Sequence, residues 1–365
     1  MIARQRGQKG AWIDMIRFRQ KQRGLARERG VALACAIAAS AAGLSTASAQ
    51  TIPTIRVGWT VPAEDAKYWM MKRPQEFPNL GKKYNVEWVQ FQGTAQMVQA
   101  MAAGALDCST QGVLSLAQGA ASAGLQTYIV AQHVGEKAPE SFSVYWAVKE
   151  DSPIKSVKDF KGKTIGLNVL GTGIWGPLAI ALKKNGIDPD KDVKLVEAAF
   201  PTQEDAIRTG RLDVGVLNQP FAARAEAKGG LRKVFAISEE IPDIVHILEA
   251  CSKTFVDKNP ELAALYVEDL TTGMGKALAN RDETLKIVTE IFKAPVQVFD
   301  PFYFKTRLSN DAPLGSADFA RDPGAAANYD GIQTMFKLYY DVGMLPKQLD
   351  VKDFKHAKIF APLKP

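Results

Sequence analysis

Short apolar runs alternate with segments of helical spacing throughout the chain after residue 50. β-Rich runs at residues 54–59 and 86–91 predict two strands. The apolar residues after the second run recur at helical spacing and predict a helix that Thr94 caps and Gly104 ends. A further strand is expected from Leu106. The pattern therefore predicts strands that alternate with helices.

The middle of the chain repeats this order. Residues 100–107 and 206–213 share the frame A-x-x-x-G-x-L-D, in which the glycine ends a helix, the leucine enters the core and the aspartate opens a strand. Two such units predict two α/β lobes built on parallel sheets that are covered on both faces. The expected elements are a strand at 164–169, a helix at 174–184, a strand at 193–196, a helix that Thr202 caps and Gly210 ends, and a strand at 212–217.

Open parallel sheets bind ligands outside the carboxyl ends of their strands. The loops expected there contain no lysine, arginine, aspartate or glutamate, and two of them lead into helix N-termini, which favour anions. We therefore expect neutral donors and indole rings to capture a small anion or polar organic acid. The candidate ligand-binding residues, with His133 added, are Trp59, Thr60, Gln92, Thr94, Ser109, Thr110, Gln111, His133, Asn168, Gly171, Thr172, Gly173, Trp175, Asn218 and Gln219.

The net charge of +7 is concentrated at the N-terminus. Residues 1–49 hold nine of the 46 basic residues and two of the 39 acidic ones, which leaves 37 of each (46 − 9 and 39 − 2) in the rest of the chain. The charge therefore does not indicate nucleic-acid binding. A basic segment, an apolar run at 31–44 and Ala47-Ser48-Ala49 predict a secretory signal peptide over residues 1–49, with Met1 or Met15 as its start. The alternatives are a buried helix and a lipoprotein signal at Cys35.

Export would place Cys108 and Cys251 in an oxidising compartment, which permits a disulfide without predicting one. We expect buried free thiols. Two catalytic hypotheses also arise: Cys108 as a nucleophile with His133 as its base, and the G-x-G-x-x-G of residues 171–176, with Glu197 further on, as a dinucleotide site. Both are less favoured, because a cysteine that opens a strand is usually core and Trp175 would crowd a pyrophosphate. The three histidines are scattered, so we expect no metal site, and no cofactor.

Residues 154–166 resemble the I-x-S-V-x-D-L-K-G-K-x-I-G stretch of periplasmic substrate-binding proteins of ABC transporters. The most similar branch is the nitrate, sulfonate and taurine type, which is related to binders of thiamine-pyrimidine precursors. Residues 185–193 resemble that branch's x-G-L-D-x-x-x-D-V run, and residues 210–221 resemble its G-x-[ILV]-D-x…P run. The likeness covers nearly all of the chain after the signal peptide.

The resemblance implies a class II periplasmic-binding-protein fold, with two α/β lobes, a hinge of two crossings and a central cleft that closes on its ligand. It implies a first lobe of residues 50–142 and 237–365 and a second lobe of residues 143–236, with crossings at 144–148 and 234–237.

The function that the resemblance implies is that of a monomeric periplasmic receptor, not an enzyme. Such a receptor delivers a sulfonate, taurine-like or carboxylate solute to an inner-membrane permease and its ATPase. Asn218-Gln219 stands where many members have an acidic residue, so the solute cannot be transferred from the family. An enzyme on the same fold, similar to thiamine-pyrimidine synthases or to a cysteine-dependent desulfinase, is the alternative.

Overall fold

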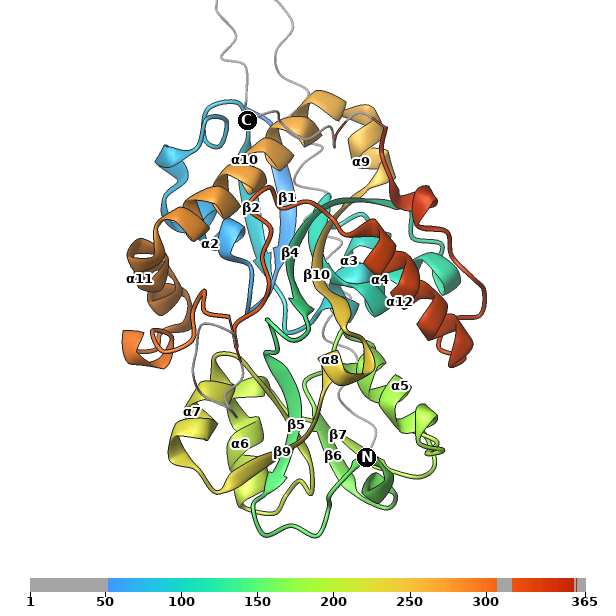
Figure 1. Cartoon of the computed structure of the whole chain (residues 1–365). Helices are drawn as coiled ribbons and strands as arrows, with labels where there is room; N and C mark the ends of the chain where they lie inside the picture. Colours follow the sequence, from blue (N-terminus) through green and yellow to red (C-terminus); the bar gives the residue numbers. More distant parts are fainter. Residues whose placement is uncertain (1–51, 307–316, 358, 360–365) are drawn as a thin grey trace, which may run out of the picture. The chain divides into compact units, whose positions relative to one another are not determined.

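The computed structural model describes residues 52–306, 317–357 and 359, which form two α/β lobes (Figure 1). The predicted signal peptide, its cleavage site and Cys35 lie outside the described residues. The elements are β1 (Thr54–Trp59), α2 (Asp65–Lys72), β2 (Asn85–Gln90), α3 (Thr94–Ala102), β3 (Cys108–Gly112), α4 (Val113–Ser122), β4 (Thr127–Lys137), β5 (Val144–Lys149), β6 (Thr164–Leu167), α5 (Trp175–Lys184), β7 (Lys194–Glu197), α6 (Phe200–Arg208), β8 (Gly215–Asn218), α7 (Phe221–Lys228), β9 (Leu231–Ala236), α8 (Ile237–Glu240), β10 (Asp243–Ser252), α9 (Lys253–Lys258), α10 (Pro260–Ala279), α11 (Arg281–Phe292) and α12 (Tyr329–Asp341).

The larger lobe is built on a five-stranded sheet with the order β2-β1-β3-β10-β4. β1 is parallel to β2 and β3, as predicted, but β10 is antiparallel to both of its neighbours. The expectation of parallel sheets is therefore wrong for this lobe, and it is also wrong for the three-stranded sheet of the smaller lobe, in which β5 is antiparallel to β8 and β9. β10 reaches the sheet only after the chain has passed through the smaller lobe, so its direction is not set by a strand–helix–strand connection.

The smaller lobe contains the sheet β8-β5-β9 and the parallel pair β6-β7, which a bridge between Ile165 and Val214 connects. The segments predicted as crossings are strands β5 and β9 of this lobe, and they pair antiparallel with each other. The chain passes between the lobes beside them, through residues 138–143 and through α8. The limits of the lobes at 142/143 and 236/237 stay a prediction.

The repeated A-x-x-x-G-x-L-D frame has the same local structure in both lobes. Gly104 and Gly210 follow the helices with φ values of 71° and 73°, as predicted. The carboxylate of Asp107 accepts the Arg56 amide at 2.9 Å, and that of Asp213 accepts the Thr164 amide at 2.8 Å. Each aspartate thus ties the loop before one strand to the start of a neighbouring strand.

The predicted helix caps are wrong by a few residues. Thr94 is the first residue of α3, whose N-cap is Gly93, and Thr202 lies inside α6, whose N-cap is Ala199. Neither helix has a side chain that caps it, so the amide groups of its first turn are not occupied by a capping side chain. Among the described residues, no helix has the length and apolar character needed to cross a lipid bilayer.

Candidate functional site

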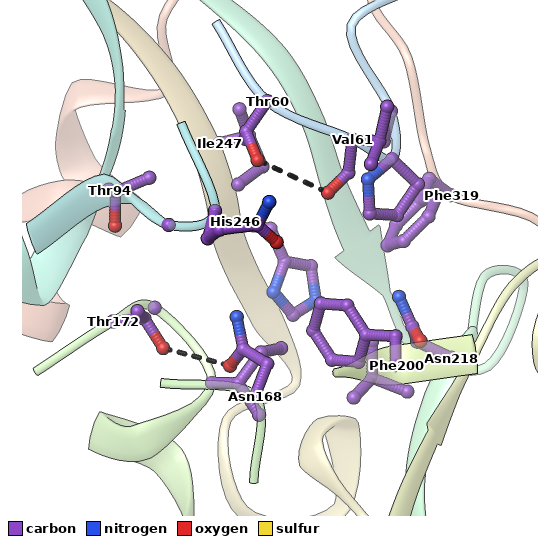
Figure 2. A pocket seen from close by; sticks show the side chains of 17 residues that line it. Thr60, Val61, Thr94, Asn168, Thr172, Phe200, Asn218, His246, Ile247 and Phe319 are labelled. Carbon is purple, nitrogen blue, oxygen red and sulfur yellow. Dashed lines mark hydrogen bonds between the residues drawn. The ribbon is translucent and has the colours of Figure 1, made fainter. Parts of the chain in front are cut away.

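A cavity with about 540 Å³ of empty space is lined by loop and strand residues of both lobes (Figure 2). Thr60 follows β1, and Gln92 and Thr94 lie between β2 and α3. Asn168 follows β6 and Asn218 ends β8, on the other lobe. Seven of the predicted site residues line this cavity, namely Thr60, Gln92, Thr94, Asn168, Thr172, Gly173 and Asn218.

The rest of the cavity wall is mostly apolar, and its residues are not among the predicted site residues. Phe200 at the start of α6 and Phe319 of the C-terminal segment supply aromatic rings, and His246 of β10 is the histidine that lines the cavity. No lysine, arginine, aspartate or glutamate is among the described residues that line it. Further apolar contacts come from Val61, Pro62, Ala63, Val144, Ile174 and Ile247.

A second, wider pocket of about 1060 Å³ adjoins the first and shares Thr60, Gln92, Asn168 and Phe200 with it. Its additional wall is more polar and includes Glu197, whose carboxylate accepts the amide of Leu170 at 2.7 Å. The two pockets therefore form one continuous recess between the loops of the two lobes, apolar in its first part and more polar in its second.

Ser109, Thr110 and Gln111 were predicted at the cleft but are completely buried inside the larger lobe. The strand β3 continues to Gly112, so these side chains lie within the sheet and not in a loop that follows it. Thr110 accepts a hydrogen bond from the Lys67 ammonium at 2.6 Å, and Gln111 donates to the Ser109 hydroxyl at 2.7 Å. These three residues therefore belong to the buried interior of the larger lobe and do not line the cavity.

Five other predicted residues also lie outside the cavity wall. Trp59 packs edge-on against Tyr68, with 6.3 Å between ring centroids, and Trp175 is part of the apolar core beneath α5. His133 is buried and lies 3.1 Å from Glu249. Gln219 is buried beside β8, and Gly171 forms a turn with a φ of 75°.

A buried charged cluster lies behind the cavity, centred on Lys67 of α2. Its ammonium is 2.6 Å from Glu249 and 3.5 Å from Glu64, and none of the three side chains is exposed. Burial raises the pKa of Glu64 although Lys67 opposes this. Burial alone would also raise the pKa of Glu249, but Lys67 and His133 outweigh it and hold that pKa below its ordinary value.

This cluster positions one wall of the cavity. The Glu64 carboxylate accepts the amide of Thr60 at 2.9 Å and so fixes the loop after β1. The neighbouring Asp65 forms an ion pair with buried Arg321, whose guanidinium also lies 2.8 Å from Asp318 and donates to the carbonyl of Phe319 at 3.0 Å. Residues at the start of α2 therefore hold both the first loop and the segment that carries Phe319.

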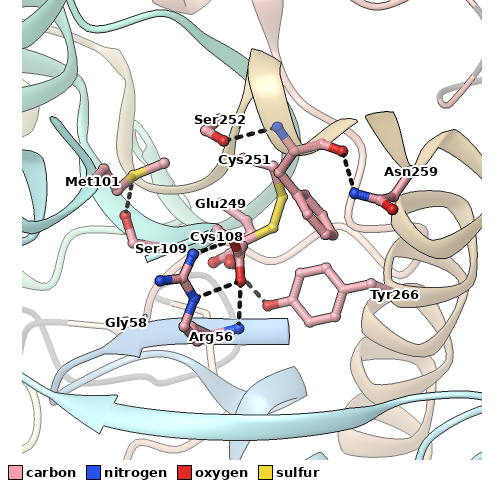
Figure 3. Close-up of a disulfide and its surroundings, with 12 residues drawn as sticks. Arg56, Gly58, Met101, Cys108, Ser109, Glu249, Cys251, Ser252, Asn259 and Tyr266 are labelled. Atoms are coloured by element: carbon pink, nitrogen blue, oxygen red, sulfur yellow. Dashed lines mark hydrogen bonds and ion pairs between the residues drawn. A yellow bond between two sulfur atoms is a disulfide. The ribbon is translucent and has the colours of Figure 1, made fainter. Parts of the chain in front are cut away.

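Cys108 and Cys251 form a disulfide that joins β3 to β10, with 3.9 Å between their Cα atoms (Figure 3). The expectation of free thiols is wrong, because the two cysteines are opposite each other in the antiparallel pair of strands. Both are completely buried, and neither lines the cavity. The hypothesis of Cys108 as a nucleophile with His133 as base is also contradicted, since the sulfur is bonded and His133 pairs with Glu249.

The glycine-rich turn of residues 171–173 lies in close contact with Gly112 of the opposite lobe. A Cβ atom placed on Gly112 would lie 2.8 Å from the backbone nitrogen of Gly173. The space that a pyrophosphate would need on this side of the turn is thus filled by the backbone of β3, and Glu197 is engaged by Leu170. This geometry argues against the dinucleotide hypothesis. Within the described residues, no group of three or more His, Cys, Asp or Glu side chains could hold a metal ion.

Comparison with known proteins identifies relatives of this chain. The family model described as NMT1/THI5 like matches residues 84–284, which is 201 of the 365 residues. The putative aliphatic sulfonates-binding protein of Escherichia coli is 21% identical over 277 residues, 75% of this chain and 81% of that protein. The riboflavin-binding protein RibY of Chloroflexus aurantiacus is 27% identical over 152 residues; this match spans 40% of this chain and only 42% of RibY.

The fold also matches solved structures. The periplasmic aliphatic sulphonate binding protein SsuA from Escherichia coli superposes with a TM-score of 0.62 at 18% sequence identity, covering 83% of this chain and 97% of that one. This likeness confirms the expected periplasmic-binding-protein fold. The chain belongs to the NMT1/THI5-like family and has the two-lobed fold of periplasmic substrate-binding proteins.

Proposed function

We propose that this protein is the solute receptor of an ABC importer and that its cavity captures a small organic acid when the two lobes close. The observation that carries the proposal is the cavity itself, which draws its wall from both lobes and lacks charged side chains among its described residues. A solute that contacts both lobes would stabilise the closed arrangement over the open one.

The acid class is supported by the helix starts at the cavity. The first turns of α3 and α5 begin beside Thr94 and Ile174, so their free amide groups and positive dipole ends favour a carboxylate or sulfonate. The relatives described as sulfonate-binding proteins are consistent with this class. The rings of Phe200 and Phe319 on the cavity wall favour an acid with an apolar or aromatic body over an inorganic anion.

The proposed function also implies where the protein acts and with which partners. The protein would be exported to the periplasm, act as a monomer, and hand its solute to a membrane permease driven by an ATPase. It would need neither cofactor nor covalent chemistry. An enzyme of the thiamine-pyrimidine-synthase type is the alternative, but it would need catalytic groups at the cavity, and the disulfide removes Cys108 from that role.

A thermal-shift screen of the mature protein tests the proposal. The compounds are sulfonates, aliphatic and aromatic carboxylates, nitrate and amino acids, each followed by calorimetry and by small-angle X-ray scattering. We expect at least one organic acid to raise the melting temperature, with a smaller radius of gyration in its presence. An acid at a hundred times its Kd stabilises by about 2.7 kcal/mol. No stabilisation by any acid, or turnover of a bound compound, would falsify the receptor function proposed here.

A further inference from the structure

Two buried polar side chains on the cavity wall each have one atom without a hydrogen bond. Asn218 is 2% exposed and His246 is 4% exposed, and both line the cavity. Neither Oδ1 of Asn218 nor Nε2 of His246 forms a hydrogen bond within the part of the chain that the structure describes. Native proteins satisfy nearly all such buried polar atoms. The two atoms therefore indicate groups that a bound solute would contact.

The two residues lie at the same end of the cavity. Asn218 pairs with Val144 across β8 and β5, and the amide of Val144 donates to Glu136 at 2.8 Å. The same carboxylate oxygen of Glu136 lies 3.4 Å from Nε2 of His246. In Figure 2, Asn218 and the ring of His246 lie near Phe200, whereas Thr94 and Thr172 lie on the other side of the cavity.

Glu136 does not supply the hydrogen-bond donor that Oδ1 of Asn218 lacks. Its Oε1 already accepts hydrogen bonds from the amide and hydroxyl of Ser143 and from the amide of Val144, at 2.7, 2.8 and 2.8 Å. An amide oxygen needs a donor, and an imidazole nitrogen can donate or accept according to its tautomer. A solute that is only a simple anion brings acceptors alone and would leave Oδ1 of Asn218 unsatisfied. A hydroxyl or amino group would satisfy it.

We propose that Asn218 and His246 select a solute that carries a hydroxyl or amino group in addition to its acid group. The acid would face the helix starts near Thr94 and Thr172, the apolar body would contact Phe200 and Phe319, and the donor group would face Asn218 and His246. This inference rests on the receptor function proposed above and narrows its solute class to hydroxy- or amino-substituted acids.

Matched pairs of acids test the inference by calorimetry. One pair is 3-phenylpropanoate with 3-(4-hydroxyphenyl)propanoate, and the other is ethanesulfonate with 2-hydroxyethanesulfonate. We expect the wild-type protein to bind the hydroxylated member of at least one pair about tenfold more tightly, because a buried site rejects a ligand that leaves its polar groups unpaired. Asn218→Leu and His246→Phe should each reduce this preference to less than about threefold.

Two further variants serve as controls for this test. Asn85→Leu removes an exposed asparagine of β2, away from the cavity, and should keep the wild-type preference. Asn218→Asp keeps acceptor oxygens in the same shape, so it should retain the preference even if Asn218→Leu fails to fold.

Equal binding of both members of each pair by the wild type overturns this inference alone and leaves the receptor function intact. A preference that persists in both Asn218→Leu and His246→Phe overturns it as well. Failure of the wild type to bind any of the four acids contradicts the inference, whereas the proposed acid class falls only if every acid of the wider screen also fails to bind.

Discussion

Gly112 of β3 and Gly173 of the other lobe are in backbone contact. A Cβ atom on Gly112 would lie 2.8 Å from the nitrogen and 2.9 Å from the Cα atom of Gly173, distances that real Cβ atoms do not adopt. Gly112 has a φ of −79°, so an alanine would fit its own backbone conformation. Its methyl group would clash with the opposite lobe and would also lie 3.3 Å from the Thr94 hydroxyl of its own lobe, a tight but less severe contact. The absence of a side chain at this position therefore permits the lobes to meet.

Gly112→Ala should weaken binding of the best solute from the screen about tenfold, or ~1.4 kcal/mol, because the methyl group holds the lobes apart. Calorimetry measures the affinity, and scattering compares the radius of gyration with solute bound. Gly275→Ala is the matched control, since a Cβ there meets nothing within 4 Å in helix α10. It should leave affinity unchanged. An unchanged affinity in Gly112→Ala would show that this contact is not needed for closure.

The disulfide should contribute to stability and not to binding. Its two cysteines are 143 residues apart, so the bond restricts a long loop in the unfolded chain. Reduction, or replacement of both cysteines by alanine, should lower the free energy of unfolding by about 2–5 kcal/mol. Guanidinium titrations with and without reductant measure this, and the double variant should not respond to reductant. Solute affinity should be the same in every form. A loss of affinity in the double variant would contradict the placement of the cysteines outside the site.

Arg321→Met should destabilise the protein strongly and also weaken binding. The change leaves Asp65 and Asp318 buried beside each other without their cation, which costs about 3–5 kcal/mol in comparable sites. Arg281→Met is the control, because Arg281 pairs with exposed Asp300 and should cost less than about 1 kcal/mol. Urea unfolding gives both values. If the two variants lose equal stability, the buried position of Arg321 has no special energetic role.

Acid should destabilise the smaller lobe through Glu204. Burial alone would raise the pKa of Glu204, but Lys228, Arg208 and Arg224 lie within 3.1 Å and lower it below the ordinary value of 4.5. In the unfolded chain the carboxyl takes up its proton near pH 4.5, whereas in the folded protein it does so only at lower pH. The stabilisation is therefore complete above this range and is lost as the pH falls through it.

Melting temperatures between pH 6 and pH 3 test this expectation. Glu204→Gln should melt at a lower temperature than the wild type at pH 6, and the difference should shrink towards pH 3. Glu261→Gln, an exposed residue at the start of α10, is the control. A difference that stays constant over the whole range would mean that the ionised form of Glu204 contributes nothing specific.

Thr94→Ala and Asn218→Ala should each weaken solute binding about 2–10-fold without unfolding the protein, as expected when one hydrogen bond is lost. Thr94 lines the cavity and accepts a hydrogen bond from Ser115 at 2.9 Å, so a small drop in melting temperature is expected for its variant. Thr202→Ala, on the exposed side of α6, should bind like the wild type. If neither cavity variant changes affinity, the solute binds elsewhere.

Local sequence signals predicted the strands and the turns well. The strand at Thr54–Trp59 and the positive φ of Gly104 and Gly210 follow from side-chain pattern and backbone sterics, which depend on a few neighbouring residues. Cavity residues at the ends of predicted strands were found for the same reason: Thr60 follows the strand predicted at 54–59, and Asn168 lies near the end of the one predicted at 164–169.

Features that depend on β10 could not be predicted. This strand joins the sheet between β3 and β4, although it follows them by more than 100 residues, and no local pattern gives its position. It pairs with Ser109, Thr110 and Gln111, brings Cys251 opposite Cys108, and places His246 at the cavity. Phe319 was missed because long-range ion pairs at Arg321, not secondary structure, position its segment.

The place of β10 in the sheet constrains the order in which the chain can assemble. A polypeptide that emerges from its N-terminal end delivers β1 to β4 first, yet the gap between β3 and β4 stays open until residue 252 has emerged. The strands of the smaller lobe, by contrast, all lie within one uninterrupted stretch, residues 144–236. Until β10 has emerged, the facing edges of β3 and β4 have no partner strand and can pair with strands of other chains, which leads to aggregation. A partly synthesised chain that still lacks β10 therefore has to stay unfolded, or its unpaired strand edges have to be covered by another protein.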